Sequence, residues 1–600
     1  MALAAPSGGI PIHCAKLCLR SERMSQMSGN RFLLYAIGLG SALICALPLY
    51  PQSVSACGGL FCSASAPVNQ AAERIIFSKN EDGTVTAVVQ IQYSGPSEEF
   101  AWVLPVPGIP DVDVSSDLAF TRLQQASNPQ YILTTEIEGD CRQDELDRNT
   151  SFGPPQGSSG TGGTGGGGGS EGVNVLASGT VGPYDFVVIE PVASFERVGD
   201  VAVEWLTDEG YDVVPPGGDP NDISELLGSY LQDAMNLLAF RLTKGNATGT
   251  IRPIWITYAS SQPMIPIRPT AVAANDDMGV MVWVLGNDRA VAVNYRSLVL
   301  NEALIDWTTG GSNYNQVVIA AANEAGGQGF VTERAGTSVD YDNVVLSEFE
   351  RQAWDTLRAS GGELSSEELL IQSAQTIGSW DGYRDVVERF LPESVDINDF
   401  LGCPSCGHAL EPIDNQAFID ALGLEVMDPM IETQALITSR PYVTRLYTTL
   451  SAPEMDLDPL FDFNPDLEDA PNLHNARQVI ECNPTIYPWE APSRIELEDG
   501  RVVRLSPNSP WPFAPGTEDA PPANAIVAQL STSGPGEIVT DNRDAIERAL
   551  DEHNATVPSL NGWAVAGSGG CTLSQGRPDA AWWIGLALLG LLIRRRQSLR

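Results

Sequence analysis

Two apolar runs near the ends of this 600-residue chain limit what can fold as one water-soluble body. The first run covers residues 32–49 and is followed by the small-residue stretch 53–56, an order typical of a secretion signal. The second run covers residues 580–593 and is followed by three arginines. The sequence therefore predicts a leader over 1–56, an exported body over 57–570 and a C-terminal sorting or anchor tail over 571–600.

Two alternatives remain for the leader. Its apolar run is nearly long enough to span a bilayer, so it could stay in place as an uncleaved signal anchor. Residues 54–57 also fit a loose lipidation motif in which Cys57 would carry the lipid. Cys62 lies five residues further on and offers Cys57 a disulfide partner instead.

The tail combines a cysteine, an apolar run and a basic end. Cys571 follows the small residues 567–570, and a short polar spacer separates it from the apolar run. This order resembles the myxobacterial C-terminal sorting tails, and the resemblance implies that Cys571 is the point of processing and attachment. The run is expected to form a hydrophobic helix, although it is shorter than the roughly 20 residues of a stable membrane span. A permanent membrane anchor is the alternative, and both interpretations make the membrane a partner and put the body outside the cytoplasm.

The charge balance excludes partners that need a basic surface. The chain holds 76 acidic and 34 basic residues, a formal net charge of −42. Without the leader and the tail, residues 57–570 keep 74 acidic and 25 basic residues, a net charge of −49. Nucleic acid is therefore not expected as a partner. With 43% hydrophobic residues the body can still bury a large core, so it is expected to be globular.

Six of the ten cysteines fall in the predicted body. They are Cys57, Cys62, Cys141, Cys403, Cys406 and Cys482. An even number in an exported protein is most simply explained by three disulfides, but the sequence does not choose among the possible pairings.

The segment Cys403-Pro-Ser-Cys406-Gly-His408 allows three interpretations. A redox dithiol would need its first cysteine at a helix N-terminus, and the flanking sequence lacks the expected strand–helix–strand pattern. A zinc site could use Cys403, Cys406 and His408 with His474 or Cys482, but there is no second pair of closely spaced cysteines. A structural disulfide is the favoured interpretation.

Hydrophobic periodicity predicts an α+β fold. We expect a β-rich half with packed helices over 57–335, interrupted by a flexible glycine-rich insertion at 157–172, and a mixed, mostly helical region over 336–570 that ends in a short β-containing part. The predicted strands are 74–78, 84–93, 100–106, 184–190, 251–258, 264–273, 279–285 and 289–295, with a hairpin at 495–505. The predicted helices are 200–209, 222–242, 343–360, 365–377, 383–391 and 415–422, of which the second should be capped by Asp222 or Ser224 and the fourth by a Ser365–Glu368 capping box.

An acidic stretch at 454–469 is the candidate for calcium, because it concentrates carboxylate oxygens. Its candidate ligands are Asp456, Asp458, Asp462 and Asp466. The stretch lacks the glycine and the ligand spacing of an EF-hand loop, so a solvated turn segment with apolar residues docked on the body is the favoured interpretation. No other cofactor is predicted.

Catalytic motifs are not evident, and no catalytic residue is assigned. The body holds three histidines, His408, His474 and His553, and no Gly-x-Ser-x-Gly elbow accompanies them. Carboxylate pairs for glycosidic chemistry could occur among its acidic residues, but a sequence does not show their separation.

Several blocks resemble the bacterial domain-of-unknown-function family 2330. The opening blocks are Cys57-Gly-Gly-Leu-Phe-Cys62, Pro67-Val-Asn-Gln70, Glu73-Arg-Ile-Ile-Phe77 and Phe100-Ala-Trp-Val-Leu-Pro-Val-Pro107. Later blocks are 181–185, 209–211, 251–253 and 263–268, so the resemblance covers about 57–335. It implies an exported bacterial protein, in some members with a sorting tail. It implies no activity and no site residue.

These observations favour an exported, surface-anchored structural or interaction module of the cell envelope, with an unidentified surface or extracellular partner. The alternative is an extracellular hydrolase that uses carboxylates, with or without calcium. Two inward-facing carboxylates or a Ser/His pair in a deep pocket would favour the hydrolase.

Overall fold

The computed structural model describes residues 62–560, with gaps at 64–65, 68, 95–100, 143–172, 193–196, 212, 214–218, 243–251, 273, 518–519 and 558–559. Sheets and helices share this part of the chain, and the predicted α+β class is confirmed. The predicted leader, glycine-rich insertion and C-terminal hydrophobic helix lie outside the described residues. Within them, no helix combines the length and the apolar character that crossing a bilayer requires.

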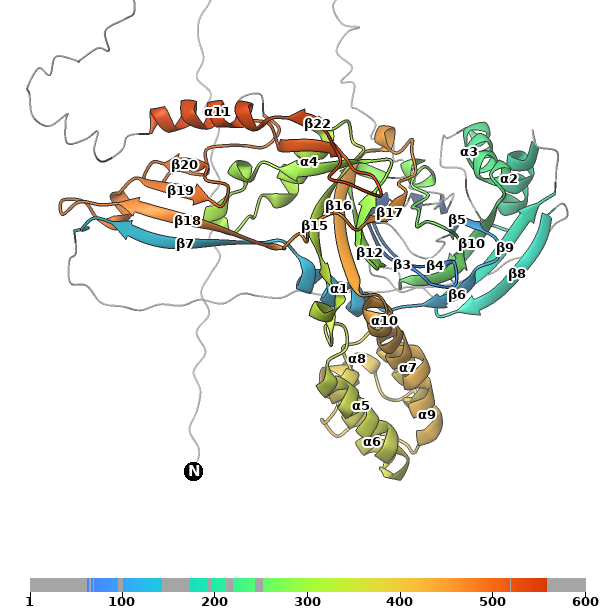
Figure 1. The fold of residues 1–600 in the computed structure, drawn as a ribbon. Helices are drawn as coiled ribbons and strands as arrows, with labels where there is room; N and C mark the ends of the chain where they lie inside the picture. Colours follow the sequence, from blue (N-terminus) through green and yellow to red (C-terminus); the bar gives the residue numbers. More distant parts are fainter. Residues whose placement is uncertain are drawn as a thin grey trace, which may run out of the picture. The chain divides into compact units, whose positions relative to one another are not determined.

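A ten-stranded mixed sheet organises the body (Figure 1). Its strands, in spatial order, are β22 (Glu537–Asp541), β21 (Asn524–Gln529), β14 (Arg296–Leu300), β15 (Gly329–Thr337), β16 (Tyr442–Leu450), β12 (Ala274–Gly286), β3 (Asn69–Lys79), β4 (Thr84–Ser94), β11 (Ile254–Ala259) and β6 (Asp111–Val114). Strand β16 pairs with both β12 and β15, so strands from the predicted segments 57–335 and 336–570 meet in one sheet.

Strands β3 and β4 form the predicted hairpin. Gly83 closes the turn with a φ of 83°, a conformation that favours glycine. Both faces of this hairpin are buried. Ile75 and Phe77 belong to the core on one face, and Ile76 belongs to the core on the other.

A four-stranded antiparallel sheet packs on the first of these faces. It contains β5 (Ala101–Pro107), β10 (Met235–Leu242), β9 (Tyr184–Pro191) and β8 (Val173–Val181), in that order. Leu104 and Leu238 share a hydrophobic core with Ile75 of the large sheet. Helices α2 (Val198–Asp208) and α3 (Pro220–Gln232) cover the outer face, where Trp205 and Leu227 pack.

The predicted helix 222–242 is wrong in its second half. Helix α3 ends at Gln232, Ala234 adopts a φ of 60°, and the chain continues as strand β10. Strand β10 lies between β5 and β9, and Leu237 and Leu238 are both fully buried on its opposite faces. A short apolar run suits a buried strand and a buried helix equally, so periodicity did not separate them. The helix is capped by Asp219 rather than by Asp222 or Ser224.

The predicted strand 264–273 is also wrong. Met264 forms one isolated bridge with Leu460, and a short 3-10 helix, η2 (Pro269–Val272), follows. The segment contains Pro266 and Pro269, which have no backbone N–H for a strand ladder. The predicted strand 289–295 is shorter than expected: it is β13 (Arg289–Ala292), which pairs with β17 (Phe461–Asn464).

Helices pack on the second face of the large sheet. They are α1 (Asp117–Ser127), α5 (Glu348–Ser360), α6 (Ser366–Ile377), α7 (Tyr383–Phe390), α8 (Ile397–Gly402), α9 (Asn415–Leu422) and α10 (Asp428–Thr438). The capping box of Ser365 and Glu368 is confirmed. Helix α5 begins later than predicted, because Ser347 and Glu350 form a second capping box at its start.

A further four-stranded sheet contains β20 (Val502–Leu505), β19 (Ser493–Leu497), β18 (Leu473–Glu481) and β7 (Gln130–Glu138). The predicted hairpin between β19 and β20 is confirmed, with Gly500 at a φ of 86°. Strand β7 pairs in parallel with β18, more than 300 residues away in sequence. This sheet shares a core with α4 (Tyr314–Glu324) and α11 (Arg543–Thr556). A short pair, β1 (Cys62–Ser63) and β2 (Ala66–Pro67), precedes β3.

A buried ion pair connects the middle of the large sheet to its helices. Arg445 of β16 and Glu333 of β15 are 1% and 3% exposed, and Arg445 Nε lies 2.5 Å from Glu333 Oε2. Arg445 Nη1 also donates to Ser127 Oγ at the end of α1 (2.9 Å), and Tyr314 OH of α4 donates to Glu333 Oε1 (2.7 Å). Because each charge is compensated by the other and by hydrogen bonds, the network can be buried.

We predict that Arg445→Met lowers the free energy of unfolding by about 3–5 kcal/mol, because Glu333 would keep a buried charge without its partner. Chemical denaturation of the two proteins measures the difference. The control is Arg477→Met, since the Arg477 guanidinium pairs with Glu136 and Glu496 at 49% side-chain exposure. Removing such an exposed ion pair should lower the free energy of unfolding by less than about 1 kcal/mol. Equal losses in the two variants would contradict the prediction.

Candidate functional site

An apolar cavity of about 200 Å³ lies between the large sheet and the β5–β10 sheet. Strands β3, β4 and β11 form one wall, β5 and the start of β10 form the other, and the segment 260–266 closes one side. Most of the lining is aliphatic or aromatic, and it includes Ile75, Phe77, Val89, Leu104 and Ile256. The cavity therefore occupies a gap in the core shared by the two sheets.

Glu73 is the one charged side chain among the described residues that line this cavity. It is 6% exposed, and its single hydrogen bond comes from Gln70 Nε2, which donates to Glu73 Oε2 at 3.3 Å. Residues three apart in a regular strand face opposite sides of the sheet. The pairing register of β3 with β4 shifts between Gln70 and Ala72, and this bulge turns Gln70 to the same side as Glu73.

Burial raises the pKa of Glu73 to about 7, and the hydrogen bond from Gln70 opposes this rise only in part. Gln70 is itself 2% exposed, and its Oε1 has no hydrogen-bond partner among the residues that the structure describes. A small adjoining cavity of about 10 Å³ is lined by both side chains together with Trp102 and Thr270. The site thus holds a carboxyl with one hydrogen bond and an amide oxygen with none, in apolar surroundings.

Neither Gln70 nor Glu73 was predicted as a site residue. The available signal was the strand pattern: Glu73 has the same parity as Ile75 and Phe77, so a two-residue period places a carboxyl on a core-facing side. The β-bulge that turns Gln70 toward Glu73 is not indicated by any comparable sequence pattern.

The three histidines of the body lie apart from this cavity and from one another. His408 Nε2 lies 2.8 Å from the carbonyl oxygen of Cys403, and His553 Nε2 lies 2.8 Å from that of Arg504. His474 Nδ1 lies 2.7 Å from Glu302 Oε1. Each histidine therefore has a local hydrogen-bond partner, and none faces a hydroxyl nucleophile among the described contacts.

The four calcium candidates also have separate partners. Asp456 accepts a hydrogen bond from Gln328, and Asp458 accepts one from Tyr230 OH at 2.7 Å. Asp462 lies 3.2 Å from Lys79 Nζ, and Asp466 accepts from the backbone N–H of Gly534 at 2.7 Å. In the described part of the chain, no group of three or more His, Cys, Asp or Glu side chains is placed to hold a metal ion.

Apolar residues of the acidic stretch dock on the body. Met455 and Phe461 are 1% and 0% exposed and belong to the core between the two sheets. The contacts therefore resemble the turn segment that was the favoured interpretation, and the calcium site stays a prediction.

Cys403 and Cys406 form a disulfide with a Cα–Cα distance of 5.4 Å. The bonded sulfurs offer no thiolate to a metal ion. Cys403 follows the last residue of helix α8, so it lies at a helix C-terminus, where the helix dipole does not favour a thiolate. Neither the zinc site nor the redox dithiol gains support from this arrangement.

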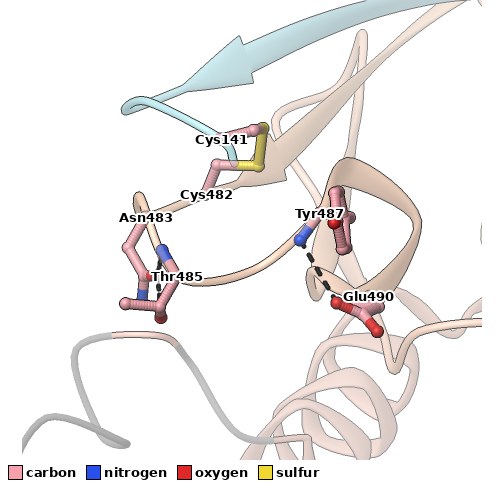
Figure 2. Close-up of a disulfide and its surroundings, with 6 residues drawn as sticks. All are labelled: Cys141, Cys482, Asn483, Thr485, Tyr487 and Glu490. Atoms are coloured by element: carbon pink, nitrogen blue, oxygen red, sulfur yellow. Dashed lines mark hydrogen bonds between the residues drawn. A yellow bond between two sulfur atoms is a disulfide. The ribbon is translucent and has the colours of Figure 1, made fainter. Parts of the chain in front are cut away.

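A second disulfide joins Cys141, after β7, to Cys482, after β18 (Figure 2). The two cysteines are 341 residues apart in sequence and become neighbours because β7 and β18 pair in parallel. Beyond Cys482 the loop is held by local bonds, such as the backbone N–H of Thr485 donating to Asn483 Oδ1 at 2.9 Å. Cys57 and the side chain of Cys62 lie outside the described residues, so the predicted third pair stays a prediction.

A larger surface depression of about 800 Å³ lies between β21 and α11. It is charged, and several of its side chains already have partners: Asp499 pairs with Arg501, and Glu302 contacts His474. The cavity at Glu73 is the stronger candidate site, because it holds a buried carboxyl that receives one hydrogen bond from the described residues.

Fold and cavity together define a disulfide-bonded α+β protein with a small apolar chamber between two β-sheets. The chain belongs to the bacterial family described as "Uncharacterized protein conserved in bacteria (DUF2330)", whose sequence model matches residues 51–355. No curated protein and no solved structure matches the chain. The matched part contains Gln70, Glu73 and all five strands that wall the cavity.

We predict that Glu73→Gln stabilises the protein more at high pH than at low pH. The folded-state pKa of Glu73, about 7, lies above its ordinary value of 4.5. The wild type therefore has its full stability below pH 4.5 and loses part of it as the pH rises through 7. The variant has no carboxyl to ionise. Relative to the wild type, its free energy of unfolding should be higher by about 3 kcal/mol at pH 8 and by less than about 1 kcal/mol at pH 5.

Urea denaturation at the two pH values measures this difference. Glu225→Gln is the matched control, because it removes the same charge from an exposed position on α3. A gain for Glu73→Gln that does not change with pH would show that the Glu73 carboxyl is not buried as described.

Proposed function

We propose that this protein is an exported, surface-anchored interaction module whose body binds a small apolar molecule in the cavity between its two sheets. The observation that carries the binding proposal is Glu73, a buried carboxyl that receives one hydrogen bond among the described residues and lines a mostly apolar cavity, with the unbonded Oε1 of Gln70 in the small cavity beside it. A chamber with apolar walls and a few convergent polar groups is the usual form of a small-molecule site.

Export is supported by the covalent chemistry of the body. Two disulfides join Cys141 to Cys482 and Cys403 to Cys406. Disulfides persist in oxidising compartments and are rare where cytosolic thiols keep cysteines reduced. We propose that the leader directs export and that the C-terminal run 580–593 forms the hydrophobic helix of the anchor, with Cys571 as the attachment point.

The hydrolase alternative has no comparable support. Glycosidic chemistry needs two carboxyl groups about 5–10 Å apart across one substrate bond. The described lining of the cavity contributes one, Glu73, and no histidine. An interaction module is therefore the better proposal for this site.

We predict that Cys571→Ser abolishes surface retention in a host that processes such tails, because the attachment sulfur would be missing. Cells expressing the full chain are treated with an external protease, and the body is quantified on the cells and in the medium. Cys57→Ser is the matched variant, since it removes the sulfur that the lipidation alternative needs. If Cys57→Ser is lost from the cell surface while Cys571→Ser is retained, the result would favour N-terminal lipidation and contradict the tail proposal.

We predict that the exported protein, purified without detergent and with its disulfides intact, binds six-carbon apolar probes such as 1-hexanol. Cavities of about 150 Å³ accept benzene, so this chamber has room for six carbons. Ala87→Leu should weaken binding at least about tenfold, because Ala87 of β4 lines the chamber and the added carbons would fill part of it. Calorimetry or ligand-observed NMR measures the affinity.

The control for the filling variant is Ala359→Leu, which makes the same change at an exposed position of α5. It should bind 1-hexanol as the wild type does. Equal binding by Ala87→Leu and the wild type would place the probe elsewhere and contradict the cavity proposal.

A further inference from the structure

Two buried acceptor groups lie at the cavity and receive few hydrogen bonds from the described residues, whereas the lining residues Ser260 and Gln262 donate to partners elsewhere. A carboxylate can accept about four hydrogen bonds, and the Glu73 carboxyl receives one, from Gln70. Gln70 Oε1, in the small adjoining cavity, is a second buried acceptor, and it has no partner among the described residues. A ligand group that donates several hydrogen bonds would satisfy these acceptors.

Among the described residues around the cavity, no positively charged side chain pairs with Glu73. Its register neighbours are Ile91 on β4 and Val280 on β12, and both are apolar. Besides Glu73, the titratable group in the lining of the two cavities is Tyr258, and burial raises the pKa of its phenol well above the ordinary value. Tyr258 therefore stays neutral.

Two arginines that are close in sequence to residues lining the two cavities have other partners. Arg74 follows Glu73 on the opposite face of β3, where Nη1 donates to Gln90 at 3.1 Å. Arg268 stacks on the Tyr230 ring at 5.0 Å, and its Nη2 donates to Ser229 Oγ at 3.0 Å. A cation at Glu73 would thus have to come from the ligand.

We infer that the ligand of this cavity is a short alkyl- or arylalkylamine, whose ammonium group binds the Glu73 carboxylate while its apolar part fills the chamber. This inference rests on the proposed binding function and adds the chemical class. An ammonium carries three donors, no acceptor and a positive charge, so it matches the site in each respect. An alcohol offers one donor, and a carboxylate ligand would be repelled by Glu73. The chamber volume of about 200 Å³ limits the apolar part to a few carbons.

Binding should be coupled to loss of a proton from Glu73. Below pH 7 the buried carboxyl is mostly protonated and neutral, so the incoming ammonium displaces that proton to solvent. Above pH 7 the carboxylate is already ionised and no proton is released. Since the binding-competent fraction rises about 90-fold between pH 5 and pH 8 for a group with a pKa of about 7, the amine affinity should rise by a similar factor.

The test compares hexylamine, 1-hexanol and hexanoate on the exported protein at pH 8 by calorimetry. We expect hexylamine to bind at least about tenfold more tightly than 1-hexanol, and hexanoate to bind more weakly than either. Glu73→Gln should lower the hexylamine affinity at least about tenfold, so that on this variant hexylamine no longer binds more tightly than 1-hexanol. Glu225→Gln, which removes an exposed charge, should behave like the wild type.

A pH series on the wild type gives a measurement that needs no variant. Hexylamine affinity should rise about 90-fold from pH 5 to pH 8, whereas 1-hexanol affinity should change little or move the opposite way. If 1-hexanol binds and hexylamine binds no better at any pH, the amine inference is overturned and the cavity function stands. If none of the three probes binds, the proposed binding function fails together with the inference.

Discussion

The central strands of the ten-stranded sheet, β3, β4, β12 and β16, are buried on both faces, and the rest of the structure depends on that constraint. These strands must supply side chains to two cores at once: the even residue Ile76 packs toward the helices, while the odd residues Ile75 and Phe77 pack toward the second sheet. Polar groups inside such a sheet need partners from the same layer. Arg445 and Glu333 meet this requirement with each other, and Glu73 has only Gln70.

Local signals predicted much of the fold. The β3–β4 turn, the Ser365–Glu368 capping box and the β19–β20 hairpin were predicted because a positive φ or an N-cap needs particular residue types within a few positions. The assignment of β10 failed because Met235–Leu242 carries apolar side chains on both faces, and tertiary position alone decides whether such a run is strand or helix.

The candidate site was less predictable than the fold. Glu73 occurs in one of the sequence blocks that resemble the family, yet its place in a cavity depends on a backbone irregularity at Ala71–Ala72 and on strands from two distant parts of the chain, 69–107 and 235–259. The strongest sequence motif, Cys403 to His408, proved to hold a local disulfide. Residue types that suggest chemistry were visible in the sequence. The cavity was not, because it exists only where two sheets face each other.

The Cys141–Cys482 disulfide also changes the effect of a peptide-bond cleavage on the protein. It closes a covalent loop over 341 positions, and that loop includes most of the cavity-facing second sheet and all helices from α2 to α10. A single peptide-bond cleavage inside the loop leaves both pieces on one molecule. After one such cut in a surface segment, the disulfide keeps the two pieces covalently linked for as long as it stays oxidised.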